Sequence, residues 1–268
     1  MATLFQVGVG SGGMPVLDLV ARDPRITSVT LVDPDDYAPH NVVRHVFPAT
    51  DVGQRKVLLA ERWLRERRPD LSVRALAVDL LDPNHATALT EASTAADLGI
   101  CAADNEAAKF RFDELMRRGR KPWTLGEVLA GGIGGFVHVF VPGGPCYGCV
   151  ASVLQRSVHV DTSKPPDYSA PGGPVPEATI PASKAAIAVI AGLHAVTTLD
   201  LIDEPAGPGF TSLLLPLRKV DGIFAEAFRP RRLQVARSAT CLVCGTPEPM
   251  AENLDRALDE ALERLGDV

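Results

Sequence analysis

Short apolar runs alternate with longer amphipathic stretches along the first half of the chain. The apolar runs are bounded by turn residues and predict strands near residues 4–9, 27–32, 72–78, 97–102 and 122–126. In the stretches between them, apolar side chains recur every three or four residues, which predicts helices near residues 13–22, 53–67, 84–94 and 105–118. Because strand and helix alternate in this way, we expect an α/β fold with a doubly wound, mostly parallel, Rossmann-like sheet.

The pattern changes after about residue 130. A glycine-rich turn leads into the apolar run FVHVFV, and a stretch with six prolines follows, from Arg156 to Pro181. We interpret this stretch as a crossing loop, because long segments without secondary structure are usually functional or disordered. A helix capped by Ser183, the strand-like runs LLLPL and IFAEAF, and a last helix over 251–268 complete the pattern. These runs predict a C-terminal antiparallel extension of the sheet.

The length and composition fit one large domain with a small appendage. The chain has 268 residues, of which 46% are hydrophobic and 22% charged, enough to bury a sizeable core. We expect the domain to span residues 1–250, with a nucleotide-binding half over about 1–130 and a second half over about 131–250. The crossing loop, over about 156–181, belongs to the second half.

The charge pattern argues against a nucleic-acid partner. The formal net charge is −6, whereas affinity for a phosphate backbone rests on clustered lysine and arginine. One basic run has helical spacing with acids around it, which is typical of a solvated helix face: Arg62, Arg65, Arg67 and Arg68.

The sequence also predicts a cytoplasmic protein without a membrane span. The first strand begins almost at the N-terminus, with no basic region or cleavage site before it. The most apolar helical stretch, Ala185 to Leu199, is shorter than the roughly 20 apolar residues that a span needs. We expect this stretch to be a core or subunit-interface helix.

A glycine turn between the first strand and the first helix carries the first chemical signal. Gly8, Gly10 and Gly13 have the spacing GxGxxG, in which backbone amides and a helix N-terminus can receive phosphate oxygens. A tight turn without a ligand would give the same pattern. Asp33 ends the second strand, where a carboxylate can accept both ribose hydroxyls of either NAD or ATP. Asp35 is a further candidate, although an ordinary acid in a solvated turn fits equally well.

Two cations and an amide favour a triphosphate over a dinucleotide. Asn41, Arg44 and Lys56 follow the acids in order. The charge of a triphosphate must be neutralised before a nucleophile can approach the α-phosphorus, and a dinucleotide has no such need. Each residue alone would be an unremarkable surface group, so the ordered set carries the prediction.

Asp104 and Asn105 close the fourth predicted strand, at the edge of the sheet where α/β proteins bind ligands. A carboxylate at this place can hold Mg²⁺ that bridges phosphate oxygens, and Asn105 is a further candidate for nucleotide contact. Asp104 could also cap the helix predicted over 105–118, and the two roles are compatible.

The five cysteines form two close pairs and one single residue. The pairs in CYGC and CLVC have the two-residue spacing that places both sulfurs on one tetrahedral Zn²⁺. We predict a structural zinc that joins distant segments, with two disulfides or free thiols as the alternatives. The predicted ligands are Cys146, Cys149, Cys241 and Cys244.

These motifs, taken in order from about residue 4 to 246, resemble the ThiF/MoeB/HesA family, the adenylyltransferase domain shared with ubiquitin-activating enzymes. The matching series is GxGxxG, D-x-D-x(5)-N-x-x-R, VGQ-x-K, DN and two CxxC pairs. The resemblance implies that Gly8, Gly10, Gly13 and Asp33 cradle ATP, that Asn41, Arg44 and Lys56 contact its phosphates, and that Asp104 positions Mg²⁺.

The resemblance also implies a reaction and partners. A carboxylate, usually the C-terminal glycine of a ubiquitin-like or sulfur-carrier protein, attacks the α-phosphate of ATP and gives an acyl-adenylate and pyrophosphate. The half over 131–250 would bind the acceptor, and the protein would form a homodimer.

Three departures from the family pattern qualify the resemblance. Many members send an arginine from a helix before the first strand into the partner's site, whereas the first arginine here is Arg22. His45 stands where glutamine is frequent, and we expect it to be structural. Relatives that pass the acyl group to a thiol carry a cysteine in the crossing loop, which has none here. Cys101 is expected to be a small buried side chain, so the resemblance implies activation that stops at the adenylate.

Other functions remain open at this point. The acceptor could be a small molecule or short peptide of a biosynthetic pathway. An NAD-dependent oxidoreductase would use the glycine turn but would leave Arg44, Lys56 and Asp104 without a purpose. A non-catalytic partner subunit is disfavoured by those three residues and favoured by the absent N-terminal arginine.

Overall fold

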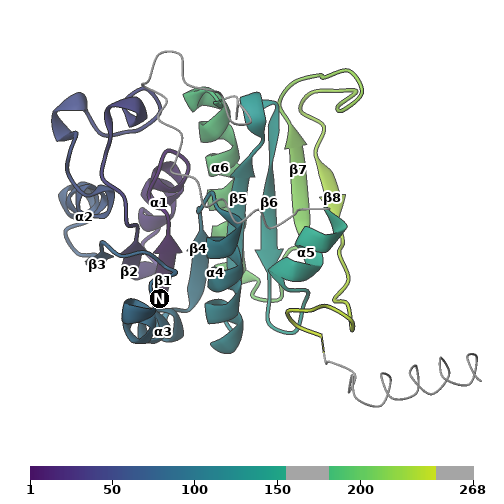
Figure 1. The fold of residues 1–268 in the computed structure, drawn as a ribbon, viewed down its shortest axis with the longest axis horizontal. Coiled ribbons are helices and arrows are strands. Elements are labelled where there is room, and N and C mark those ends of the chain that lie inside the picture. The colour runs from purple at the N-terminus through teal and green to yellow at the C-terminus, as the bar shows by residue number, and fades with distance from the viewer. Residues whose placement is uncertain (155–180, 246–268) are drawn as a thin grey trace, which may run out of the picture.

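One eight-stranded sheet forms the centre of the molecule (Figure 1). The computed structural model describes residues 1–154 and 181–245. The strand order is β3-β2-β1-β4-β5-β6-β7-β8; the pairs from β3 to β5 are parallel and those from β5 to β8 antiparallel. This arrangement confirms the predicted mostly parallel sheet with a C-terminal antiparallel extension. The strands are β1 Ala2–Val7, β2 Ile26–Val32, β3 Ser72–Leu76, β4 Leu98–Cys101, β5 Trp123–Val128, β6 Gly134–Phe140, β7 Ser212–Pro216 and β8 Arg231–Leu233.

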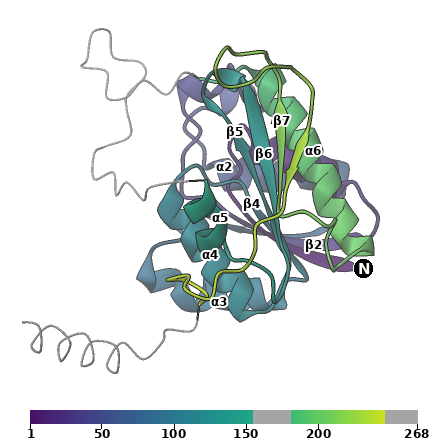
Figure 2. The same ribbon diagram turned by 90° about the vertical axis from the view of Figure 1, so that its right-hand side faces the viewer.

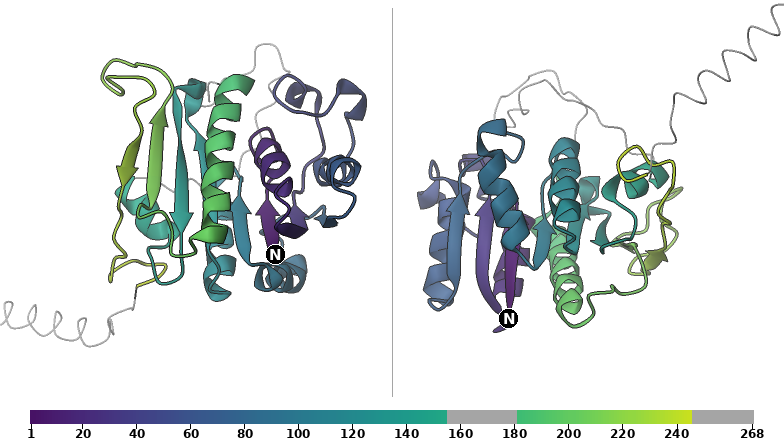
Figure 3. Two further views of the ribbon diagram at one scale, coloured as in Figure 1. Left: turned by 180° about the vertical axis from the view of Figure 1, so that it is seen from behind. Right: turned by 90° about the horizontal axis from the view of Figure 1, so that it is seen from below.

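Helices cover both faces of the sheet and give the fold two hydrophobic cores (Figures 2 and 3). On one face lie α1 (Gly13–Ala21), α2 (Lys56–Arg67) and α6 (Lys184–Asp203). On the other lie α3 (Ala86–Ala95), α4 (Glu106–Arg118) and α5 (Tyr147–Val153). The left view of Figure 3 shows α6 beside α1 across the back of the sheet. This layering is what a doubly wound sheet requires.

The long helix α6 is a core helix. Ser183 caps it as predicted, because its Oγ accepts a hydrogen bond of 3.2 Å from the backbone N–H of Ala186. Among the described residues, α6 alone has the length and mean hydropathy (1.9) that a membrane span would need. Half of that window is buried inside the fold, and α6 packs on β5, β6 and α1. Its apolarity therefore matches its position against the sheet.

One predicted strand is wrong. The run IFAEAF, residues 223–228, forms turns and one isolated bridge between Val220 and Phe224. Phe228 adopts a positive φ of 56°, and its N–H donates to the carbonyl of Pro216. A left-handed residue ends any extended run, so the edge strand β8 begins three residues later. The crossing loop over 156–180 and the predicted helix over 251–268 lie outside the described residues.

The parallel strands end level with one another where the strand order reverses. Val7 of β1 pairs in register with Val32 of β2 on one side and with Cys101 of β4 on the other. The chain leaves β1 toward β2 in one direction and β4 toward β5 in the other. Doubly wound sheets bind ligands in the crevice at this switch point, beyond the carboxyl ends of the strands. The candidate site is therefore built from the residues that follow β1, β2 and β4.

Candidate functional site

The glycine loop between β1 and α1 has two glycines required by packing and one that faces open space. A Cβ on Gly8, whose φ is +87°, would lie 2.6 Å from the carbonyl oxygen of Ala102. A Cβ on Gly13 would lie 2.1 Å from the carbonyl oxygen of Gly8. At Gly10 nothing lies within 4 Å of the same position, so the loop leaves room there for a ligand to approach its backbone.

Two buried polar side chains bind the carbonyl oxygens of this loop. Gln6 Nε2 donates to the carbonyl oxygens of Gly8 (3.0 Å) and Gly13 (2.9 Å), which ties the two ends of the loop together. His45 Nε2 donates to the carbonyl oxygen of Val9 at 3.0 Å. The prediction that His45 is structural fits this contact. Gln6 is not among the predicted site residues, although a single glutamine in the apolar run TLFQV is a signal of a buried polar role.

Asp33 holds the loop from the side of β2. Its Oδ2 accepts from the N–H of Val9 at 2.8 Å, and its Oδ1 accepts from the N–H of Asp35 at 2.9 Å. Burial raises the pKa of Asp33, and the Val9 hydrogen bond and the nearby Lys56 partly offset this rise. Each carboxylate oxygen has a second lone pair, so the group can still accept from a ligand hydroxyl.

The acids after β2 pair with cations of α2 and the residue before it. Asp35 Oδ2 lies 2.6 Å from Lys56 Nζ, and the Lys56 side chain is only 10% exposed. Asp36 Oδ1 lies 3.3 Å from Arg55 Nε in an exposed ion pair. In this structure Asp35 thus fixes the first residue of α2 close to the glycine loop.

Asn41 and Arg44 lie in a turn between β2 and α2. The Oδ1 of Asn41 accepts from the N–H of Ala38, and its carbonyl accepts from the N–H of Arg44, both at 2.9 Å. Asn41 therefore shapes the turn that presents Arg44. The half-buried guanidinium of Arg44 makes no hydrogen bond or ion pair with any residue in 1–154 or 181–245.

The segment after β4 separates the two roles considered for Asp104. The cap of α4 is Asn105, whose Oδ1 accepts from the N–H of Ala108 at 2.8 Å, so the alternative role of Asp104 as the cap is wrong. Asp104 is exposed, and its carboxylate has no partner among the described residues. This segment adjoins the glycine loop, because a Cβ on Gly13 would lie 3.0 Å from Ala102 Cβ. Asp104 is therefore free to bind a ligand or cation at the switch point.

A chain of charged and polar groups connects α4 to the antiparallel strands. Lys109 is buried, and its Nζ lies 2.6 Å from both Glu106 Oε1 and Glu127 Oε1. Glu127 Oε2 lies 3.0 Å from His138 Nε2, and Tyr147 O–H donates to Glu106 Oε2 at 2.6 Å. Buried charge pairs contribute little net stability when complete, but removing one partner is costly. We therefore assign this group of side chains a structural role, in which the Tyr147–Glu106 bond joins α5 to α4. None of these side chains is among the predicted site residues.

Four cysteine sulfurs lie together at the N-terminal end of α5. The Cys146–Cys149 distance is 3.8 Å, the Cys146–Cys241 and Cys149–Cys244 distances are both 3.6 Å, and the four sulfurs lie within 4.8 Å of one another. Four sulfurs about 2.3 Å from one tetrahedral Zn²⁺ would lie about 3.8 Å apart. The cysteines are free thiols, and the observed separations exceed a disulfide bond of about 2.05 Å.

The backbone segments that carry the two cysteine pairs pack closely, with glycines at the points of contact. A Cβ on Gly148 would lie 2.7 Å from Val243 Cγ2, and a Cβ on Gly245 would lie 2.3 Å from the carbonyl oxygen of Ala239. The N–H of Val243 points at Cys241 Sγ at 3.4 Å. Burial raises the pKa of Cys146, and hydrogen bonds lower that of Cys241 to about 7 against the effect of its burial. The donor set and spacing thus fit the predicted zinc.

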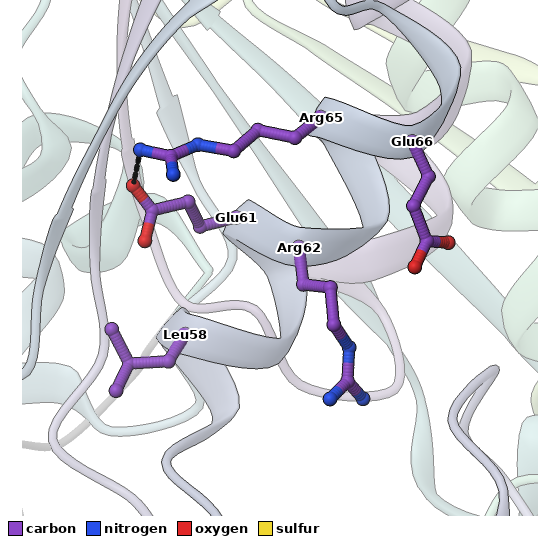
Figure 4. Close-up of a pocket in the computed structure, with 5 residues that line it drawn as sticks. All are labelled: Leu58, Glu61, Arg62, Arg65 and Glu66. Atoms are coloured by element: carbon purple, nitrogen blue, oxygen red, sulfur yellow. Dashed lines mark hydrogen bonds and ion pairs between the residues drawn. The ribbon is translucent and has the colours of Figure 1, made fainter.

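A hollow on the outer surface of α2 lies apart from this site (Figure 4). It is lined by one apolar side chain, Leu58, and by charged residues of α2. Arg62 pairs with Asp51, and Arg65 pairs with Glu61, each at 2.7 Å. These pairs fit the predicted solvated helix face for Arg62 and Arg65. For Arg68 the prediction is wrong, because its side chain is only 15% exposed and donates to the carbonyls of residues 21, 23 and 26.

Comparison with known proteins agrees with this geometry. The sequence profile of the ThiF family matches residues 2–243. A sulfur carrier protein adenylyltransferase of Thermus thermophilus is 30% identical over 261 residues, which cover 95% of this chain and 86% of that protein. Protein HesA of Leptolyngbya boryana is 25% identical over 265 residues, which cover 98% of this chain and 84% of that protein.

A solved structure shares the fold. The crystal structure of MccB from E. coli with ATP has a TM-score of 0.65 and 20% sequence identity, and the match covers 91% of this chain and 67% of MccB. The ThiF match spans both the switch-point edge of the sheet and the first three cysteines of the cluster. The chain therefore belongs to the ThiF family.

Proposed function

We propose that this protein is an ATP-dependent adenylyltransferase that activates a carboxylate as an acyl-adenylate and releases pyrophosphate. One observation carries the proposal: the open glycine loop lies at the switch point together with Arg44 and Asp104, whose charged groups have no partner among the described residues. Family membership and the Thermus thermophilus relative support the same activity. A cation and a carboxylate left without partners near a phosphate-accepting loop are what Mg·ATP chemistry needs.

The residues divide the work as follows. The glycine loop and the N-terminus of α1 receive phosphate oxygens, and Asp33 accepts the ribose hydroxyls. The acceptor carboxylate attacks the α-phosphorus, the bond to the bridging oxygen breaks, and the electron pair leaves with pyrophosphate. Arg44 and Lys56 stabilise the negative charge that grows on this leaving group. Asn105 and Asn41 hold the segments that carry Asp104 and Arg44.

Asp104 is the proposed ligand of Mg²⁺, because Mg²⁺ is commonly held by one or two carboxylates plus phosphate oxygens. An ion held there would supply positive charge that offsets part of the phosphate charge. The four cysteines hold Zn²⁺ in a structural role, since four thiolates leave no open position for catalysis.

The proposed acceptor is the C-terminal carboxylate of a sulfur-carrier or ubiquitin-like protein. The name of the Thermus thermophilus relative supports this class, because that protein acts on a sulfur carrier. A short-peptide or small-molecule carboxylate is the second candidate. The same nucleotide chemistry serves both, and the acceptor that supports exchange distinguishes them.

The nucleotide prediction tests the proposed function first. We expect calorimetric titration to show binding of Mg·ATP and little or no binding of NAD, because unpaired Arg44 suits a triphosphate. We also expect ATP–pyrophosphate exchange that depends on an acceptor with a free C-terminal carboxylate. An acceptor with an amidated C-terminus is the matched control. Tight NAD binding without ATP binding contradicts the proposal.

The cysteine of β4 provides a separate prediction. Cys101 is completely buried, and burial raises its pKa to about 12, so the reactive thiolate is suppressed. We expect Cys101→Ser to keep pyrophosphate exchange within about twofold of the wild type. Mass spectrometry of the wild-type reaction should find no acyl adduct on this residue, and a reducible adduct there would refute the prediction.

A further inference from the structure

The amino-terminal end of α6 brings another cation to the edge that carries the glycine loop. Lys184 is the first residue of α6, and its Nζ donates a hydrogen bond of 2.9 Å to the carbonyl oxygen of His45. His45 follows Arg44 directly and donates to the carbonyl of Val9 in the glycine loop. Figure 1 shows α6 beginning at the upper edge of the sheet, toward which β1 and β4 run. The ammonium group is thus linked to the loop through one side chain.

Lys56 and Lys184 both act electrostatically on His45. Burial lowers the pKa of His45 to about 4, and the hydrogen bond to Val9 partly offsets this. Both Lys56 and Lys184 lower it further, so both ammonium groups act on the same buried ring. Both cations therefore act on one anchor of the glycine loop, and Lys184 also contacts the backbone of that residue.

The cations at this edge differ in whether an acidic side chain already pairs with them. Lys56 pairs with Asp35 at 2.6 Å, so Asp35 offsets part of its charge before a ligand binds. Lys184 has no acidic partner in the described part of the chain, and neither does Arg44. An ammonium has three N–H donors, so two remain on Lys184 after the bond to His45. A strongly anionic ligand would therefore meet two unmatched cations here.

We propose that Lys184 is a phosphate-binding residue of the nucleotide site and supplies, with Arg44, the charge that holds the triphosphate. This inference rests on the proposed adenylyltransferase function. The hydrogen bond to His45 fixes the direction of the ammonium group before the nucleotide arrives. Because phosphate oxygens are the ligand, the contribution appears with ATP and not with adenosine.

The test is calorimetric titration of the full-length protein with Mg·ATP and with adenosine. Lys184→Met should weaken Mg·ATP binding on the order of tenfold and leave adenosine binding unchanged, as expected for one lost charge-assisted contact. Lys184→Arg, which keeps the charge, should restore most of the affinity. Lys219→Met is the matched control, because Lys219 is 69% exposed in the loop between β7 and β8. It should bind both ligands like the wild type.

The outcomes separate this inference from the proposed function. Equal Mg·ATP affinity of wild type and Lys184→Met would overturn the inference alone, whereas a wild type without ATP affinity would overturn both. A Lys184→Met variant that weakens only the acceptor, measured as its KM in pyrophosphate exchange, would also overturn the phosphate assignment. If Lys184→Met does not fold, Lys184→Gln takes its place, since it keeps a donor for His45 without the charge. The same loss of ATP affinity is then expected, and unchanged affinity refutes the inference.

Discussion

Replacing Asp104 by asparagine should lower ATP–pyrophosphate exchange at least a hundredfold while the protein stays folded. The carboxylate has no partner in the described structure, and the neighbouring Asn105 caps α4, so no structural contact is lost. What is lost is the proposed ligand of Mg²⁺, and with it the neutralisation of charge on the leaving pyrophosphate. The measurement is the initial rate of exchange with saturating acceptor, together with thermal unfolding.

The control for this prediction is another exposed aspartate. Asp221 has a side chain that is 98% exposed, and its nearest cation, Lys219, lies at 3.9 Å. Asp221→Asn removes the same charge from the loop between β7 and β8, three strands beyond β4 in the sheet, and should leave both exchange and unfolding unchanged. Raising the Mg²⁺ concentration should restore part of the activity of Asp104→Asn if the defect is metal placement. Full exchange by Asp104→Asn would refute the proposed role.

Removing zinc should lower the melting temperature strongly. The sulfurs hold α5 and the segment 241–244 together, so their metal contributes directly to the folding free energy. We expect Cys146→Ser to lose the ion and about 3 kcal/mol or more of stability, a drop in Tm on the order of 10 °C for a chain of this length. Elemental analysis should find one zinc per wild-type chain.

Cys101→Ser is the matched control, because it removes a buried thiol outside the cluster. It should keep the metal and show a much smaller change in Tm than Cys146→Ser. A thiol count adds a second readout: a chelator should expose the four cluster cysteines to a thiol reagent. Wild-type protein prepared without chelators that contains no zinc, or a Tm unaffected by metal loss, would contradict the prediction.

Much of the fold was readable because apolar periodicity and chain geometry agree. Runs such as LFQV and LGIC are short, apolar and bounded by turn residues, so the parallel strands were predicted within a few residues of where they lie. The extension after residue 216 was harder. IFAEAF has the composition of a strand, yet the left-handed backbone of Phe228 ends any extended run there. Composition does not record such a conformation for a residue other than glycine.

The sequence nominated the members of the candidate site but did not reveal how they pair. Order along the chain pointed to Arg44, Lys56 and Asp104, since cations and an acid after the right strands suit a triphosphate. Sequence did not reveal that Asp35 pairs with Lys56. It also gave no reason to link Lys184 to this edge. Lys184 is distant from β1 in the sequence and reaches the edge only because α6 packs on α1. Long-range contacts of this kind depend on tertiary structure.

The cysteine cluster also joins segments that are distant in the sequence. Cys146 and Cys241 are 95 positions apart, so a bound zinc closes a loop that contains α6, β7 and β8. A disulfide between the same positions would persist in the unfolded chain and lower its entropy, whereas a zinc site assembled by folding contributes its binding free energy to the folded state. Unlike a disulfide, this cross-link forms without oxidation and resists reductants. Joining the two cysteine pairs therefore requires a supply of metal and no oxidising environment.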